Sequence, residues 1–361
     1  MKAKDFPKLV DIRRDVERRK QLFAKPDLTY LFWECTLSCN LKCVHCGSSC
    51  EARSPVKELT TEEIFGILDT IGEDFDPCRI FVSITGGEPL MRKDLFQVVD
   101  KMHRMGMQAC IVTNGVLLGR KQASLLAEAG MQTITISVDG LKAEHEAMRG
   151  EGTFDKTLAA IGHCRAVGMN VVEAITCVRP SNLDSLAEIE AEVRAAGATH
   201  YRLITIDRMG RVSGEPDPEL WMEPHHVNRL FKYIEQRRQA EAEGKGDAVR
   251  FSCGGFLGVD RELSVRPEMG QCYAGLCVGS ILADGQVSAC PSLPRSWAQG
   301  SALERRFSEI WRDEFKAFRD LRWRKEGHCQ GCSWFDICLG GGLHERLVQP
   351  GDFCWLDRQG L

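Results

Sequence analysis

Between residues 28 and 207, short runs of β-branched and aromatic residues alternate with longer segments of helical period. Runs of about four to eight such residues are typical of buried strands, whereas apolar residues spaced three and four apart are typical of amphipathic helices. The alternation predicts six strand–helix units that share a parallel sheet. The predicted strands are Leu28–Cys35, Arg79–Ile84, Gln108–Val112, Thr133–Val138, Val171–Val178 and Tyr201–Ile206.

The segments between these strands carry helix signals. A helix is expected over residues 61–71. It opens with Thr60-Thr61-Glu62-Glu63, in which a hydroxyl residue stands three positions before a glutamate, as in an N-terminal capping box. A second amphipathic stretch covers Ser181–Ala196. Right-handed crossovers would arrange the six units as an open α/β fold, a partial (β/α)6 TIM-like barrel.

Four polar or glycine-rich motifs follow successive predicted strands. CNLKCVHC follows the first strand, TGGEP the second, TNG the third and SVDG the fourth. Because the C-terminal ends of parallel strands meet at one rim of a barrel, we expect these motifs to lie close together. The rim is therefore the predicted active site.

Composition narrows the class of protein. The 361 residues are 43% hydrophobic and 27% charged, which is enough for a globular core. The net charge of −4 provides no basic field for nucleic acid or an anionic membrane. No apolar stretch approaches the roughly 18 residues of a spanning helix, and the charged start is unlike a signal peptide. We expect a cytoplasmic protein with no nucleic-acid partner and no transmembrane segment.

The alternation stops near residue 207. Residues 208–250 are polar and contain several glycines and prolines before a helical stretch, which predicts a connector. Residues 251–361 contain eight of the 17 cysteines and few apolar runs, so this part is expected to need metal to fold. We expect an N-terminal helical extension over 1–27, a barrel over 28–207, the connector, and a cysteine-rich C-terminal domain.

The first cysteine motif is C-x3-C-x2-C, formed by Cys39, Cys43 and Cys46. Structural zinc sites use four closed ligands, usually from paired C-x2-C motifs, so an odd triplet disfavours zinc. Cys35 or Cys50 could supply a fourth ligand, although packing is the simpler interpretation of both. Three thiolates on a [4Fe–4S] cluster would instead leave one iron open to another ligand.

C-x3-C-x2-C after a first strand and GGEP after the second together resemble the radical S-adenosylmethionine (SAM) superfamily. The resemblance covers about residues 28–207. It implies that Cys39, Cys43 and Cys46 hold a catalytic [4Fe–4S] cluster whose open iron binds SAM. Reductive cleavage of SAM would give a 5′-deoxyadenosyl radical that abstracts a hydrogen atom from the substrate. An external donor such as flavodoxin or ferredoxin would supply the electron.

The resemblance also assigns residues to SAM. The GGEP loop would bind the methionyl ammonium, with glycines that let backbone approach a ligand. Ser137 and Arg149 would contact the ribose or carboxylate, and His45 would pack on the adenine. Asp139 of SVDG could instead be only a helix cap. The residues assigned to SAM are His45, Gly86, Gly87, Glu88, Asn114, Ser137, Arg149 and Ile204.

The C-terminal cysteines resemble the SPASM extension, which carries auxiliary iron–sulfur clusters. Residues 279–291 would form its two-stranded hairpin, with Asp284-Gly285 as the turn. The family pattern implies that one cluster is held by Cys329, Cys332, Cys338 and Cys354. It implies that another is held by Cys272, Cys277 and Cys290, and the candidate for its fourth ligand is Cys253.

One expected ligand is missing from that pattern, because Gly342 stands where C-x5-C-x3-C requires a cysteine. We therefore expect one or two auxiliary clusters, one of them open or differently ligated. A [2Fe–2S] centre, a position kept for substrate, and zinc at C-x2-C stay open alternatives. The remaining Cys78, Cys110, Cys164 and Cys177 lie in apolar patterns and are interpreted as packing residues.

Many SPASM relatives modify peptides or proteins, and we expect such a substrate here. A small molecule or haem precursor is the alternative, and a non-catalytic iron–sulfur or zinc scaffold is a further one. Four loop motifs at one rim disfavour the scaffold, which needs no cofactor cradle. Sulfatase-maturing relatives place an Asp after the hairpin cysteine, and Pro291 here disfavours that activity. The sequence also resembles a subgroup associated with lipoproteins.

Residues near the sixth strand are candidates for contact with the substrate. Tyr201, Arg202, Asp207 and Arg208 could face the open side of the barrel, although charged residues at strand ends are more often simply solvated. We hypothesise that Asp207 or Arg208 helps to place the substrate.

Overall fold

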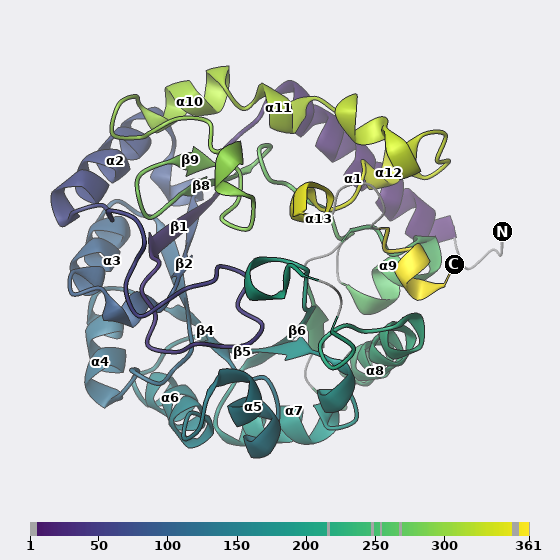
Figure 1. The fold of residues 1–361 in the computed structure, drawn as a ribbon, viewed down its shortest axis with the longest axis horizontal. Coiled ribbons are helices and arrows are strands. Elements are labelled where there is room, and N and C mark those ends of the chain that lie inside the picture. Colours follow the sequence, from purple (N-terminus) through teal and green to yellow (C-terminus); the bar gives the residue numbers. More distant parts are fainter. Residues whose placement is uncertain are drawn as a thin grey trace.

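The computed structural model describes residues 6–214, 217–246, 249–252, 255–266, 269–348 and 354–360. In these residues one nine-stranded sheet has the order β7-β6-β5-β4-β3-β2-β1-β8-β9. Its neighbouring strands are parallel except for the antiparallel pair β8 and β9. Helices surround the curved sheet (Figure 1). The predicted α/β partial barrel is therefore confirmed.

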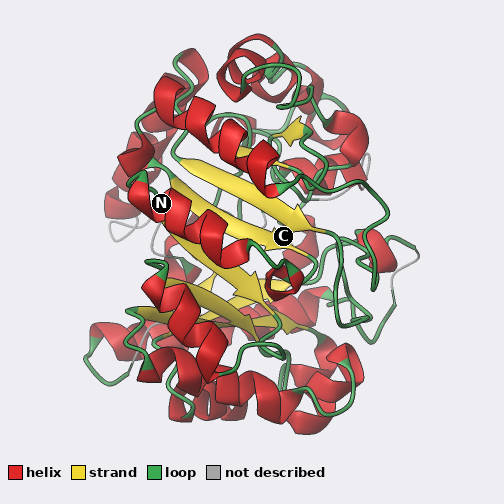
Figure 2. Cartoon of the chain, turned by 90° about the vertical axis from the view of Figure 1, so that its left-hand side faces the viewer, coloured by secondary structure: helices red, strands yellow, loops and turns green. Residues whose placement is uncertain are grey.

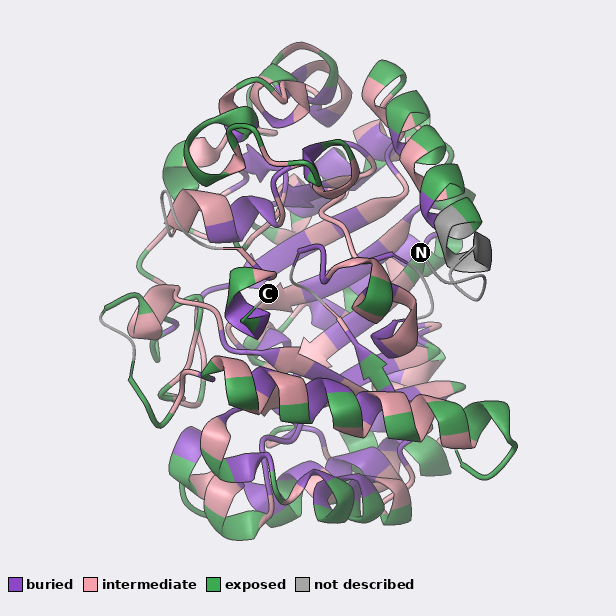
Figure 3. Cartoon of the chain, turned by 90° about the vertical axis from the view of Figure 1, so that its right-hand side faces the viewer, coloured by how far each residue is buried: buried purple, intermediate pink, exposed green. Residues whose placement is uncertain are grey.

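The six predicted strands form the centre of the sheet. Their branched and aromatic side chains fill the core, and Trp33, Ile111 and Ile134 are fully buried. Buried residues concentrate in the strands, whereas the outer faces of the helices are exposed (Figure 3). The strands are β1 (Tyr30–Thr36), β2 (Phe81–Gly86), β3 (Gln108–Thr113), β4 (Thr133–Ser137), β5 (Val171–Val178) and β6 (His200–Thr205).

Three further strands extend the sheet beyond the prediction. They are β7 (Val249–Phe251), β8 (Val278–Ile281) and β9 (Val287–Ser288). The predicted hairpin is present as β8 and β9, with Gly285 at φ 83° in its turn. The sequence did not reveal that β8 pairs in parallel with β1, which makes the barrel sheet continuous with the C-terminal segment.

Helices cover the outside of the barrel. The predicted capping box opens the first of them: Thr60 Oγ1 accepts from the Glu63 amide at 3.2 Å, and the Glu63 carboxylate accepts from the Thr60 amide at 2.7 Å. These helices are α2 (Thr61–Asp74), α3 (Leu95–Arg104), α4 (Arg120–Glu128), α5 (Lys142–Arg149), α6 (Phe154–Ala166), α7 (Leu186–Ala195) and α8 (Pro224–Ala242).

The remaining helices come from the N-terminal and C-terminal segments of the chain. The N-terminal helix α1 packs against α9 and α12 (Figure 1). Seen from the side, the strands run beside one another between layers of helix (Figure 2). No described helix is long and apolar enough to cross a membrane. These helices are α1 (Phe6–Ala24), α9 (Val259–Val265), α10 (Phe307–Asp313), α11 (Lys316–Arg319), α12 (Phe335–Cys338) and α13 (Leu343–Val348).

Candidate active site and cysteine sites

A cavity of about 340 Å³ lies at the C-terminal ends of the barrel strands. The loop after β1, the ends of β2 to β6 and the segment after β6 form most of its wall, and Ser292 and His344 contribute from the C-terminal segment. The predicted residues that line it are Cys39, Cys43, His45, Cys46, Gly86, Gly87, Asn114, Ser137, Arg149 and Ile204. Four motifs separate in sequence therefore meet, as expected of one rim.

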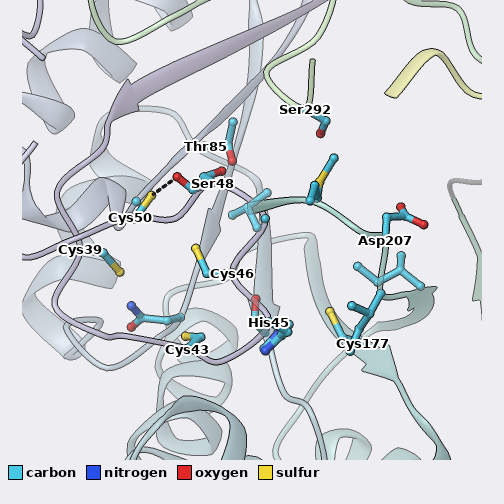
Figure 4. A pocket seen from close by; sticks show the side chains of 18 of the residues that line it. Cys39, Cys43, His45, Cys46, Ser48, Cys50, Thr85, Cys177, Asp207 and Ser292 are labelled. Atoms are coloured by element: carbon cyan, nitrogen blue, oxygen red, sulfur yellow. Dashed lines mark hydrogen bonds between the residues drawn. The ribbon is translucent and has the colours of Figure 1, made fainter. Parts of the chain in front are cut away.

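The three cysteines of the first motif share one space. The sulfur atoms of Cys39, Cys43 and Cys46 face this space in the close-up (Figure 4). Backbone contacts fix the loop at its start and near its middle: the Cys39 amide donates to Glu51 O at 2.7 Å, and the Val44 amide donates to Met148 O of α5 at 3.0 Å. The loop is therefore held in a defined conformation by contacts within it and with α5.

Residues after β6 clamp the same loop, which the sequence did not predict. Arg211 donates to the carbonyl of Cys43 at 2.8 Å and also to that of Cys50. Gly210 has φ 58°, and a Cβ there would lie 2.3 Å from Cys46 O. Only glycine lets this segment pack so closely. The one sequence signal was a glycine beside an arginine in the polar connector.

The environment shifts the pKa values of the three thiols in different directions. Burial raises the pKa of Cys39 and of Cys43, while Arg149, with Nη1 4.0 Å from Cys43 Sγ, opposes the rise at Cys43. The neighbouring Cys50 thiol lowers the pKa of Cys46. Thiolates in a low-dielectric pocket are costly by themselves, and a bound cationic cluster offsets that cost.

Asp139 anchors two of the predicted SAM contacts. Its fully buried carboxylate accepts from Arg149 Nε at 2.6 Å and from the Cys177 amide at 2.9 Å, and lies 3.1 Å from His45 Nε2. Burial by itself raises the pKa of Asp139, but Arg149 and His45 outweigh it and hold the pKa well below its usual range. The alternative of a helix cap is wrong, because α5 begins later and its capping carboxylate is that of Glu144.

The two glycines of TGGEP make room for the protein's own backbone. Gly86 has φ 130°, and a Cβ there would lie 2.1 Å from Thr36 O. A Cβ on Gly87 would lie 2.1 Å from Ser38 O. The end of β2 can therefore lie directly against the start of the cysteine loop. Close approach to a ligand is not needed to explain the glycines, although both line the cavity.

Glu88 supports the wall from behind and is not among the residues that line the cavity. Its fully buried carboxylate accepts from Thr113 Oγ1 at 2.6 Å, from the Asn114 amide at 2.8 Å and from the Leu90 amide at 3.2 Å. Burial raises the pKa of Glu88. This carboxylate therefore joins the TGGEP loop to the TNG loop.

A pair of side chains closes the opposite wall. His344 Nε2 lies 3.1 Å from Asp207 Oδ2, and both residues line the cavity. Burial lowers the pKa of His344, but its hydrogen bond to Asp207 and the charge of Glu345 raise it to about 9. The Oδ1 atom of Asp207 is buried without a hydrogen-bond partner among the described residues. Asp207 was a sequence candidate, whereas His344, 137 positions away, was missed.

Other sequence candidates lie elsewhere. Tyr201 is fully buried and donates to Thr176 Oγ1 at 3.0 Å, so it does not face the open side of the barrel. Arg202 pairs with Glu173 at 2.6 Å. Among the cysteines interpreted as packing residues, Cys78 is exposed in a turn and Cys177 lines the cavity. The packing interpretation is wrong for Cys78, because its turn lies at the surface.

The C-terminal cysteines fall into two neighbourhoods. The first is a small cavity of about 30 Å³, lined by Cys329, Cys332, Cys338 and Cys354. The second contains Cys272, Cys277 and Cys290. Burial and the nearby charge of Cys272 raise the pKa of Cys277 and of Cys290, the latter to about 11. Cys253 lies outside the described residues. The amide of Gly342 donates to the Glu345 carboxylate at 3.1 Å, so this position caps the start of α13.

Comparisons with known proteins agree with this arrangement. The model of the radical SAM superfamily matches residues 33–196, and that of the SPASM iron–sulfur cluster-binding domain matches residues 272–333. The chain is 33% identical over 324 residues to mycofactocin maturase MftC of Mycolicibacterium smegmatis, covering 86% of this chain and 77% of that protein. It is 29% identical over 339 residues to Fe-coproporphyrin III synthase of Methanosarcina barkeri, covering 88% and 84%.

The fold also matches a solved structure, native anSMEcpe with bound AdoMet and Cp18Cys peptide. The TM-score is 0.73 at 18% identity, over 93% of this chain and 94% of that one. A cysteine-lined cavity at the rim of a partial barrel, with further cysteine sites beside it, defines a class of iron–sulfur enzymes. The chain belongs to the radical SAM superfamily and carries a SPASM domain.

The cofactors of this family are a [4Fe–4S] cluster, SAM and auxiliary iron–sulfur clusters. The residues present fit them. Three thiols share one cavity and would leave one iron of a bound cubane open to another ligand. His45 Nδ1 is buried without a hydrogen-bond partner among the described residues, as expected of a polar atom whose partner belongs to a bound ligand.

Proposed function

We propose that this chain modifies a peptide or protein by radical chemistry. When bound, the cluster and SAM supply a 5′-deoxyadenosyl radical that takes a hydrogen atom from the substrate. Cys39, Cys43 and Cys46 would hold the cluster. Arg149, fixed by Asp139, would place a cation beside the SAM carboxylate. The cavity wall would exclude water and other hydrogen donors from the reacting carbon.

The shape of the site supports the proposal of a peptide substrate. The central cavity shares Ile206 and Asp207 with a second cavity of about 350 Å³. It shares Gly47, Met209 and Ser292, among others, with a third of about 330 Å³. A small substrate needs one pocket, whereas adjoining pockets can receive residues on either side of a reacting residue.

Two relatives favour different substrates. MftC is named a maturase of mycofactocin, and it is the more similar of the two by identity. The similarity to Fe-coproporphyrin III synthase favours an iron porphyrin as the second candidate, bound in the same central cavity. Asp207 would serve either substrate as a hydrogen-bond acceptor, since its Oδ1 is buried and has no partner in the described part of the chain.

Product analysis separates the two candidates. Reconstituted holoenzyme is incubated anaerobically with SAM, dithionite and either a panel of synthetic peptides or a panel of iron porphyrins and their iron-tetrapyrrole precursors. Mass spectrometry records changes in each substrate, and 5′-deoxyadenosine is measured in parallel. We expect a mass change in a peptide that requires SAM and is lost in the Cys39/Cys43/Cys46→Ala variant. Conversion of an iron tetrapyrrole with every peptide unchanged would contradict the proposal.

A further inference from the structure

Two arginines from distant parts of the chain approach the C-terminal cysteine site, defined here as Cys329, Cys332, Cys338 and Cys354. The first is Arg346 of α13, whose Nη1 donates to Cys329 Sγ at 3.1 Å. Its guanidinium also lies over the Trp323 ring, 5.9 Å from the ring centroid. The aromatic face and the thiol together hold the cation beside this site.

The second is Arg19 of α1, which is 2% exposed. Its Nε lies 3.2 Å from Asp15 Oδ2, yet neither Nε nor Nη2 has a hydrogen-bond partner among the described residues. Asp15 also accepts from Tyr273 and Gln271, so its oxygens are shared. A buried guanidinium with unsatisfied donors is costly, which indicates that a further acceptor belongs beside it.

The position of α1 points to the C-terminal cysteine site as the source of that acceptor. Ile12 packs with Phe256, Ile337 and Cys338 in one apolar cluster. Arg19 follows Ile12 by seven residues, which is about two helical turns, so both side chains leave the same face of α1. This face is directed at α12, which ends with Cys338.

A cluster at this site would need such cations. A [4Fe–4S] cluster with four thiolate ligands carries net negative charge, and a buried charge is stable only when it is paired or hydrogen-bonded. Donors to the sulfur atoms stabilise the reduced, more negative form over the oxidised form, which raises the reduction potential.

We propose that Arg19 and Arg346 are charge-compensating hydrogen-bond donors to an auxiliary cluster at the C-terminal cysteine site, and that they raise its reduction potential. The inference rests on the proposed ligation of that cluster by Cys329, Cys332, Cys338 and Cys354. It makes α1 a functional part of the iron–sulfur region although it is remote from it in sequence.

The test is a redox titration of the holoenzyme, followed by electron paramagnetic resonance. The signal that disappears in Cys338→Ala is assigned to this cluster. We expect Arg346→Gln and Arg19→Gln each to lower the reduced-to-oxidised ratio of that signal about tenfold at fixed potential, which is a shift of about 59 mV for one electron. Arg322→Gln is the matched control, because Arg322 is 92% exposed and pairs only with Asp320 among the described residues.

The outcomes separate the inference from its premise. Unchanged potentials in both glutamine variants would overturn the inference. A full iron count and all signals in Cys338→Ala would instead show that the ligation is wrong. If Arg346→Gln fails to retain iron, the titration of Arg19→Gln decides: a potential below that of wild type supports the inference, and one equal to wild type overturns it.

Discussion

At the scale of single residues, the site depends on buried charges that neutralise one another. Asp139 is fully buried and lies between Arg149 and His45, and the paired charges hold two walls of the cavity in place. His344 and Asp207 form a second such pair on the opposite wall. Because both pairs are buried, changes in their charge should alter the stability of the protein more than the same changes in an exposed pair.

Asp139→Asn leaves Arg149 buried without its counter-charge. Removal of one partner of a buried pair costs about 3–5 kcal/mol, so we expect a loss of this size in the free energy of unfolding. Urea denaturation of the variant and the wild type measures it. Asp155→Asn is the control, since Asp155 is 70% exposed in its pair with Lys142, and it should leave stability unchanged. Equal stability of the two variants would contradict the role of Asp139.

His344 makes stability depend on alkaline pH. Its pKa is raised from 6.5 to about 9 in the folded protein, so the protonated form is stabilised by folding. Protonated His344 contributes about 3 kcal/mol at most to the free energy of unfolding. This contribution is complete below pH 6.5 and is lost as the pH rises through about 9. We expect the unfolding temperature to fall between pH 7 and pH 9.5 more steeply in wild type than in His344→Gln. Parallel curves would exclude the ion pair with Asp207.

At the scale of elements, loops that follow neighbouring strands are locked together by close backbone contacts. The end of β2 lies against the end of β1 at Gly86 and against the cysteine loop at Gly87, and the segment after β6 lies against that loop at Gly210. The cysteines can therefore converge only when these strand ends are in register.

Two glycine-to-alanine substitutions should change the free energy of unfolding in opposite directions. Gly86→Ala places a Cβ 2.1 Å from Thr36 O at φ 130°, and we expect a loss of stability above about 1–3 kcal/mol together with reduced iron content. Gly66→Ala lies within α2 with nothing within 4 Å of the new Cβ, and should stabilise by about 0.5–1 kcal/mol. Thermal unfolding and iron analysis measure both. Retained iron in a stable Gly86→Ala variant would contradict the locked contact.

The elements also show what the sequence could predict. The six central strands were found because their branched residues are local signals, and the capping box of α2 because its four residues are adjacent. The pairing of β8 with β1 and the clamp by Arg211 were not found. Both depend on segments that are distant in sequence, and no local pattern encodes their register.

The same limit applies to the site. Spacing brought the cysteine triplet and the rim motifs together, because strand ends in a parallel barrel share one rim. His344 was missed since nothing near α13 marks it as facing a strand end 137 positions away. Asp139 had an alternative interpretation as a cap, and only its contacts exclude it.

At the scale of the whole molecule, one sheet joins the catalytic rim to the C-terminal segment. Because β8 continues the sheet from β1, Ser292 and His344 can reach the central cavity. The short helix α13 carries His344 at that cavity and Arg346 at the C-terminal cysteine site. The proposed substrate site and the proposed auxiliary cluster therefore share one structural element.

The most direct measurement is anaerobic reconstitution followed by iron and sulfide counting, electron paramagnetic resonance and an assay for 5′-deoxyadenosine with dithionite. Wild type is compared with the Cys39/Cys43/Cys46→Ala variant. We predict about twelve irons, as three cubanes require, and 5′-deoxyadenosine that disappears in the variant. About eight irons would indicate a single auxiliary cluster, in line with Gly342 at an expected ligand position. Bound zinc without any 5′-deoxyadenosine would contradict the assignment of this cavity to radical chemistry.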